Sequence, residues 1–271
     1  MSKPGVKFGI CHYSLPLDGP CALEIAKEVG FDGVQLDIIK NYKKQYALAE
    51  KITQKKFLEL GRKYNIEFPS VSVRQLDEST IFGENKSVGV NAIKVAIEVA
   101  RDMSAPIVLV PTFGNSEIKS KENFNQAVEV LSQACNLAAD YGITIGAENV
   151  LPPDEIERLL NEVNRPNIKF YYDIQNHYIH KGYDSAELLE KLMPYVCEVH
   201  VKDGKNKDLS GALLGQGDTG FYECVEVLKK HNYSGWVVTE NYYDLEPLSL
   251  QDDDPVELIK MDLKTLKDAF K

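Results

Sequence analysis

The stretch from Thr144 to Asn241 contains four short apolar runs: Thr144-Ile-Gly-Ala-Glu148, Ile168-Lys-Phe-Tyr-Tyr-Asp173, Val196-Cys-Glu-Val-His200-Val-Lys202-Asp203 and Trp236-Val-Val-Thr-Glu240. At or near its end, each run carries a residue that can bind a hard divalent cation, namely Glu148, Asp173, His200 and Glu240. If the runs are parallel strands of one barrel, these side chains converge at the rim where barrel active sites lie. Three carboxylates and one imidazole suit Mn²⁺, Mg²⁺ or Co²⁺ better than a thiolate-rich zinc cage does. The alternative is that buried strands often end in polar residues where they meet solvent.

Strand-like and helix-like segments alternate along the whole chain. Expected strands cover residues 7–11, 33–38, 66–73, 106–111, 144–148, 168–173, 196–203 and 236–240. Helical periodicity indicates helices near residues 20–30, 49–64, 90–100, 124–138, from 154, 185–193, 221–228 and 255–266. Alternation implies a parallel sheet, and this number of units predicts an α/β fold, a (β/α)8 TIM barrel with one domain over residues 1–271. A doubly wound open sheet is the alternative, but no G-x-G-x-x-G follows the first strand.

For two of the expected helices, the sequence also predicts the buried side or the first residues. The helix near residues 124–138 is expected to bury one side that includes Phe124, Leu131 and Leu137. The last helix is expected to begin at Asp254-Pro255, with Asp254 as its N-cap and Pro255 as its first residue.

Composition narrows the classes of function. The net charge is -10 without a dense basic run, which argues against a broad nucleic-acid interface. Apolar stretches such as residues 106–111 are far too short to cross a bilayer, and residues 1–5 hold no apolar signal segment. We therefore expect a cytoplasmic protein with no membrane partner. The five cysteines include no Cys-x-x-Cys pair, which indicates packing residues rather than a disulfide framework or a thiolate zinc site.

Several motifs together carry a family resemblance, and they occur in this order along the chain: Gly30-Phe-Asp-Gly-Val-Gln-Leu36, Gly146-Ala-Glu148-Asn149, Tyr172-Asp173, Val199-His200-Val-Lys202-Asp203, Leu214-Gly-Gln-Gly217-Asp and Gly235-Trp-Val-Val-Thr-Glu240. In combination they resemble the xylose isomerase-like TIM barrel superfamily, and within it the sugar phosphate isomerase/epimerase group with its ketose 3-epimerases and inosose dehydratases. The resemblance covers nearly the whole chain. Each motif alone is weak, and the set is specific for the superfamily but not for a substrate.

The resemblance implies one divalent cation, with Mn²⁺ favoured and Mg²⁺, Co²⁺ or Zn²⁺ as alternatives, held by Glu148, Asp173, His200 and Glu240. It implies an isomerase or epimerase of a sugar or sugar phosphate, because a cation can stabilise the enediolate that forms when a proton leaves beside a carbonyl. Glu148 and Glu240 would then also transfer the proton as general base and acid. Proteins of this group often pair, so a homodimer is an open expectation.

Other residues are candidates for contact with the substrate. Ketose 3-epimerases usually carry a histidine three residues after the aspartate, where this chain has Asn176 followed by His177. They commonly carry an arginine where this chain has Asn206, so both departures argue against a free-ketose 3-epimerase. Lys202 lies two residues after His200, so it could polarise a carbonyl or neutralise an acid, or it could extend to solvent. His12 could line the pocket or lie on an exposed loop.

The glycine-rich turn Gly215-Gln-Gly217 has two interpretations. With Lys205 and Lys207 it could hold a phosphate, but capping of the following helix by Asp218 or Thr219 is favoured. The function also has alternatives: a dehydratase of an inosose or related keto-polyol, or a non-catalytic sugar-binding relative. The related endonuclease type is disfavoured, because the third and fourth strands end without histidine and the chain is acidic.

Overall fold

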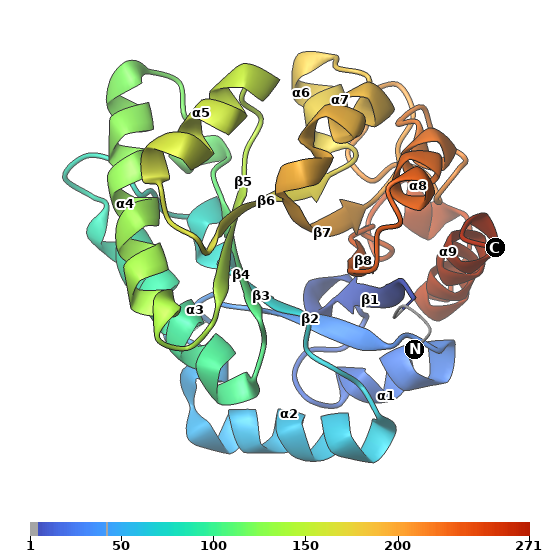
Figure 1. Cartoon of the computed structure of the whole chain (residues 1–271). Coiled ribbons are helices and arrows are strands. Elements are labelled where there is room, and N and C mark those ends of the chain that lie inside the picture. The colour runs from blue at the N-terminus through green and yellow to red at the C-terminus, as the bar shows by residue number, and fades with distance from the viewer. Residues whose placement is uncertain (1–4, 42) are drawn as a thin grey trace. The chain divides into compact units, whose positions relative to one another are not determined.

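A computed structural model describes residues 5–41 and 43–271. Among these residues, eight parallel strands close into a barrel in the order β1 to β8, and helices connect them (Figure 1). The strands are β1 (Lys7–Cys11), β2 (Gly33–Asp37), β3 (Ser70–Ser72), β4 (Ile107–Pro111), β5 (Thr144–Glu148), β6 (Ile168–Asp173), β7 (Val196–Val201) and β8 (Trp236–Thr239). The predicted (β/α)8 barrel is therefore confirmed.

The α-helices follow the strands, with one addition after β6. They are α1 (Ala22–Val29), α2 (Lys51–Tyr64), α3 (Ser87–Met103), α4 (Lys121–Ala139), α5 (Pro153–Val163), α6 (Asn176–Lys181), α7 (Ser185–Leu192), α8 (Phe221–Lys230) and α9 (Pro255–Ala269). Within the described ranges, no helix is long and apolar enough to cross a membrane. Predictions about the N-terminal segment fall on residues 1–4, outside the described part of the chain.

The chain divides into two compact units. One comprises Gln35–Glu59 and Phe68–Tyr171. In this unit β4 pairs with β3 and with β5, and Pro111 lies opposite Glu148 in the register. The other comprises Met1–Val34, Leu60–Glu67 and Tyr172–Lys271. In it β8 pairs with both β1 and β7. The prediction of a single domain stays a prediction.

Some predicted boundaries were wrong, each for a local reason. The third strand keeps only Ser70–Ser72, since Pro69 lacks the N–H that would extend the ladder. The short helix α6 was not predicted, and it begins where the Asp173 carboxylate accepts the N–H groups of Gln175 and Asn176. The first helix ends as predicted at Gly30, which adopts the left-handed conformation with φ of 100°.

The buried face of α4 was only partly predicted. Phe124 and Leu131 are buried, as expected, but the side chain of Leu137 is 46% exposed. Val130 and Ala134 are buried on that helix instead. Leu137 directly precedes the buried Ala138. Because a helix turns about 100° per residue, these two neighbours cannot lie on the same face, and the prediction was wrong to place both on the buried side.

Helix α9 is fixed to the rest of its unit by a buried carboxylate. Its start matches the prediction, because Asp254 is the N-cap and accepts a hydrogen bond from the N–H of Val256. Asp262 on the same helix accepts hydrogen bonds from the N–H of Leu214, the side-chain amide of Asn241 and the hydroxyl of Tyr243. Asp262 therefore connects α9 to the glycine-rich loop and to the residues that follow β8.

The charge state of Asp262 predicts a pH dependence of stability. Burial raises the pKa of Asp262 to about 7, although its hydrogen-bond donors act in the opposite direction. In the unfolded chain the pKa returns to about 3.9, so the folded state binds the extra proton in between, and stability falls as the pH rises through 7. Between about pH 5 and pH 8, the free energy of unfolding should fall by about 2.6 kcal/mol more in the wild type than in Asp262→Asn. Urea unfolding across this range measures the difference, and parallel curves would contradict the prediction.

Candidate functional site

Three predicted site residues lie at the carboxyl ends of β6, β7 and β8. Asp173 is the last residue of β6, and His200 is the penultimate residue of β7. Glu240 directly follows β8, where its N–H donates to the carbonyl of Val201 at 3.0 Å. All three lie in the same compact unit, and their relative exposures are 2%, 0% and 8%. The structure therefore gathers two carboxylates and one imidazole in a nearly dry environment.

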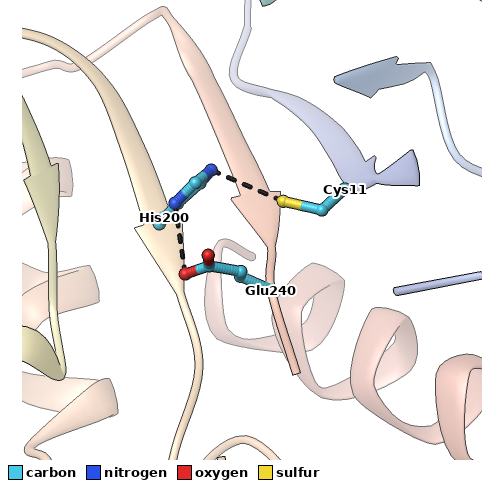
Figure 2. A group of neighbouring side chains, drawn as sticks. All are labelled: Cys11, His200 and Glu240. Atoms are coloured by element: carbon cyan, nitrogen blue, oxygen red, sulfur yellow. Dashed lines mark hydrogen bonds and ion pairs between the residues drawn. The ribbon is translucent and has the colours of Figure 1, made fainter. Parts of the chain in front are cut away.

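The His200 imidazole has a different neighbour at each ring nitrogen. Nδ1 lies 3.2 Å from Oε2 of Glu240 and 4.0 Å from Oδ2 of Asp173. Nε2 lies 3.5 Å from the Sγ atom of Cys11, the last residue of β1. Figure 2 shows this arrangement, with the thiol and the carboxylate each facing a different nitrogen of the imidazole. Nδ1 thus has carboxylate oxygens as its neighbours, and Nε2 has the sulfur.

Lys202 is buried against the same carboxylates. Its Nζ atom lies 3.0 Å from Oδ2 of Asp173 and also donates a hydrogen bond to Oε2 of Glu240. The residue is only 3% exposed. The alternative that Lys202 extends to solvent is therefore wrong, and its role toward a substrate stays a prediction. Two buried carboxylates attract the ammonium strongly, because an unpaired buried charge is costly.

Opposing electrostatic effects set the charge states of the cluster. Burial raises the pKa of Glu240, but the positive charges of Lys202 and His200 outweigh burial and hold that pKa well below its usual range. Burial and the nearby Glu240 raise the pKa of Asp173, against the opposing effect of Lys202. Burial lowers the pKa of His200, yet Cys11 and Glu240 together raise it well above its usual value. Glu240 is consequently an ionised carboxylate at neutral pH.

The other predicted substrate contacts already have structural partners. The backbone N–H of Asn176 donates to Oδ1 of Asp173 at 2.7 Å. The ring of His177 is buried and stacks on Tyr172, with ring planes 5° apart. His12 follows β1 in a short 3-10 helix, half-buried, and its Nε2 lies 3.3 Å from the carbonyl oxygen of Gly19. Their roles toward a substrate stay predictions.

Glu148 lies in the other compact unit. It is the last residue of β5 and is 5% exposed. Its carbonyl oxygen accepts hydrogen bonds from the N–H and the hydroxyl of Thr112, which fixes the end of the strand. The predicted role of its carboxylate stays a prediction.

Sequence reasoning missed two residues of the cluster. The hydroxyl of Tyr13 donates to Oε1 of Glu240 at 2.5 Å, so both oxygens of this carboxylate are engaged. Cys11 had been assigned to packing, but its sulfur faces His200. The position of Cys11 at the end of a strand is the same signal that selected Glu148 and Asp173.

Asp203 organises the glycine-rich loop, which was also missed. Its carboxylate accepts hydrogen bonds from the N–H groups of Gly204, Gly215, Gly217 and Thr219, and from the Thr219 hydroxyl. A Cβ at Gly217 would lie 2.1 Å from Oδ1 of Asp203, so only glycine fits there.

The predicted capping of the helix after this loop is wrong. The N-cap of α8 is Gly220, and no side chain caps it. Thr219 is engaged by Asp203, and Asp218 accepts from the N–H of Asn206.

The family model described as "Xylose isomerase-like TIM barrel" matches residues 23–269. The chain is 26% identical over 225 residues to a 2-epi-5-epi-valiolone 7-phosphate 2-epimerase from Actinoplanes sp., with 82% of each chain covered. It is 24% identical over 247 residues to an inosose dehydratase from Bacillus anthracis, covering 83% of this chain and 82% of the relative.

A solved structure of similar fold is the D-allulose 3-epimerase from Methylomonas sp. in complex with D-allulose. It superposes with a TM-score of 0.77 at 19% identity, and 98% of each chain is covered. The resemblance found in the sequence motifs is thereby confirmed at the level of the family.

Proposed function

Since the chain belongs to the xylose isomerase-like TIM barrel family, we propose that it is a divalent-cation-dependent isomerase or epimerase of a sugar or sugar phosphate. The observation that carries the proposal is the buried cluster of Asp173, His200, Lys202 and Glu240 at the ends of successive strands. The similarity to an epimerase of a phosphorylated compound and to inosose dehydratases supports the class of substrate. The cytoplasmic location and the homodimer stay predictions.

The residues present fit a divalent cation. Oδ2 of Asp173 and Oε2 of Glu240 face the same imidazole nitrogen and the same ammonium, so a positive group already lies against both oxygens. We propose Mn²⁺ as the ion, with Mg²⁺, Co²⁺ or Zn²⁺ as alternatives, because carboxylate oxygen with one imidazole suits such ions. Glu148 is proposed as the further ligand, since carboxyl ends of barrel strands share one rim.

The two glutamates are proposed to move the proton. When bound, the cation supplies Lewis-acid polarisation of the carbonyl oxygen of the sugar. Glu240 is ionised at neutral pH, as a general base must be, and Tyr13 holds one of its oxygens. Glu148 would return the proton on the opposite face of the substrate. Lys202 would donate to a substrate oxygen once its carboxylate partners bind the cation, and we keep His12, Asn176 and His177 as proposed substrate contacts.

Lys202 and the proposed cation would compete for the same carboxylate oxygens of Asp173 and Glu240. Lys202→Met leaves the two buried carboxylates with only His200 to compensate them in the metal-free protein, at an expected cost of about 3 kcal/mol in the free energy of unfolding. Mn²⁺ should restore most of this loss, because a ligand that binds only the folded state stabilises it. Thermal unfolding with and without Mn²⁺ measures both effects. An Mn²⁺-induced rise in Tm no larger than that of the wild type would argue against a shared position.

One assay separates the competing reactions. Mn²⁺-loaded protein is incubated in deuterium oxide with a panel of keto-sugars, their phosphates and inososes. An isomerase or epimerase incorporates deuterium beside the carbonyl and leaves the composition unchanged. A dehydratase removes water from the substrate, which becomes an enone that absorbs ultraviolet light. Binding of a sugar with neither reaction under any of the four ions would indicate a non-catalytic sugar-binding protein and overturn the proposal.

A further inference from the structure

The sulfur of Cys11 lies beside two of the proposed cation ligands. Its Sγ atom, an imidazole nitrogen of His200 and a carboxylate oxygen of Glu240 all lie within 4.8 Å of one another. Figure 2 shows that the three side chains point toward one another from different segments of the chain. All three residues are buried, with exposures of 0%, 0% and 8%. This set therefore contains a soft donor that the oxygen-rich set with Asp173 lacks.

The spacing of the sulfur and the nitrogen matches one tetrahedral metal ion. Zinc binds thiolate sulfur at about 2.3 Å and imidazole nitrogen at about 2.0 Å, so two such ligands at a tetrahedral angle lie roughly 3.5 Å apart. The observed separation of Cys11 Sγ and His200 Nε2 is 3.5 Å. Three protein ligands with one open position are the arrangement of accessible zinc sites. Hard ions such as Mg²⁺ gain little from a thiolate, whereas Zn²⁺ and Cd²⁺ favour it.

We propose that Cys11, His200 and Glu240 form a second cation site, selective for thiophilic divalent ions such as Zn²⁺ and Cd²⁺, that overlaps the site proposed for Mn²⁺. Binding displaces the proton of the thiol and the proton on Nε2 of the imidazolium, and both are released to solvent. The consequence for catalysis rests on the proposed function: Cd²⁺ takes His200 and Glu240 from the reaction and inhibits it, and Zn²⁺ does so when it binds Cys11 rather than the oxygen-rich set.

The two modes of binding exclude each other through the imidazole. A neutral imidazole carries its proton on one nitrogen and binds metal through the other. A cation at Nδ1, on the side of Glu240 and Asp173, leaves the proton on Nε2 facing Cys11. A cation at Nε2, beside Cys11, requires the proton on Nδ1 instead. Thiophilic ions and Mn²⁺ should therefore compete.

Cadmium-thiolate absorption in the ultraviolet tests the site directly. The full-length protein is titrated with Cd²⁺ as wild type, Cys11→Ser, Cys11→Ala and Cys224→Ser. Cys224 is a buried thiol on α8 and serves as the matched control. Stoichiometric absorption is expected in the wild type and Cys224→Ser and should be missing in both Cys11 variants. The preference for Cd²⁺ over Mn²⁺ should fall by at least about 100-fold in these variants, because even the loss of a group that only orients a ligand costs about 10–100-fold in affinity.

The outcomes distinguish this site from the proposed function. Unchanged Cd²⁺ affinity and absorption in folded Cys11→Ser would overturn the site, whatever the activity with Mn²⁺. Glu148→Gln should weaken Mn²⁺ binding and keep the cadmium-thiolate absorption, because Glu148 belongs only to the oxygen-rich set. Cadmium-thiolate absorption that depends on Cys11, in a protein with no turnover under Mn²⁺, would uphold the site and overturn the proposed function.

Discussion

Glu240→Gln is expected to lower kcat for deuterium exchange beside the substrate carbonyl by about 10³-fold, within the range of general-base catalysis. The amide has nearly the shape of the carboxylate but cannot accept the proton. It also removes the negative charge that Lys202 and His200 contact in the wild type. The rate is measured by NMR in deuterium oxide with saturating Mn²⁺ and the keto-sugar that the panel assay identifies.

A matched control and the metal dependence separate the two roles of Glu240. Glu223→Gln makes the same change on the exposed surface of α8 and should leave kcat unchanged. If Glu240 acts only as a ligand, excess Mn²⁺ should restore the rate of Glu240→Gln. Full restoration would therefore refute proton transfer by Glu240 and keep its role as a ligand.

Asp203→Ala should have the largest effect on stability, a loss of about 4 kcal/mol in the free energy of unfolding. Hydrogen bonds to a charged group contribute about 1.5–3 kcal/mol each and do not add fully. The substitution leaves the N–H groups of Gly215, Gly217 and Thr219 without their buried acceptor. Urea unfolding followed by circular dichroism measures the change.

The loop itself offers a control for this prediction. Asp208 lies in the same segment with an exposed side chain, so Asp208→Ala should change stability by less than about 0.5 kcal/mol. An equal loss of stability in both variants would show that removing any negative charge from this segment destabilises the protein, whether or not the carboxylate accepts hydrogen bonds from the loop. A loss below about 1 kcal/mol in Asp203→Ala would contradict its assigned role in organising the loop.

The barrel was predictable because its signal is local and repeated. Each short apolar run followed by a helical stripe has the form of a β/α unit, and the number of units fixed the closed order. The boundaries that failed depend on details that the periodicity does not show. Helix α6 begins where a side-chain carboxylate accepts backbone N–H groups, which apolar periodicity does not reveal. Leu137 is exposed because a rotation of about 100° around α4 separates it from its buried neighbour.

The residues of the candidate site were also predictable only in part. Asp173, His200 and Glu240 were found because each lies at the end of an expected strand, and the structure gathers them. Lys202 could not be decided from spacing, since its direction is set by two carboxylates from other strands. Cys11 is separated from His200 by 189 residues in sequence, and only the pairing of β1 and β7 with β8 relates them.

The central claim is that a divalent cation binds where Lys202 now contacts Asp173 and Glu240. An ammonium already neutralises Asp173 and Glu240 in the structure, so a cation must take those oxygens from it. The direct measurement is anomalous diffraction at the manganese edge from crystals grown with Mn²⁺ and a keto-sugar. We expect one manganese peak bonded to Asp173, His200 and Glu240, with Lys202 turned toward a sugar oxygen. Crystals without a manganese peak there, and with Lys202 still between the two carboxylates, would contradict it.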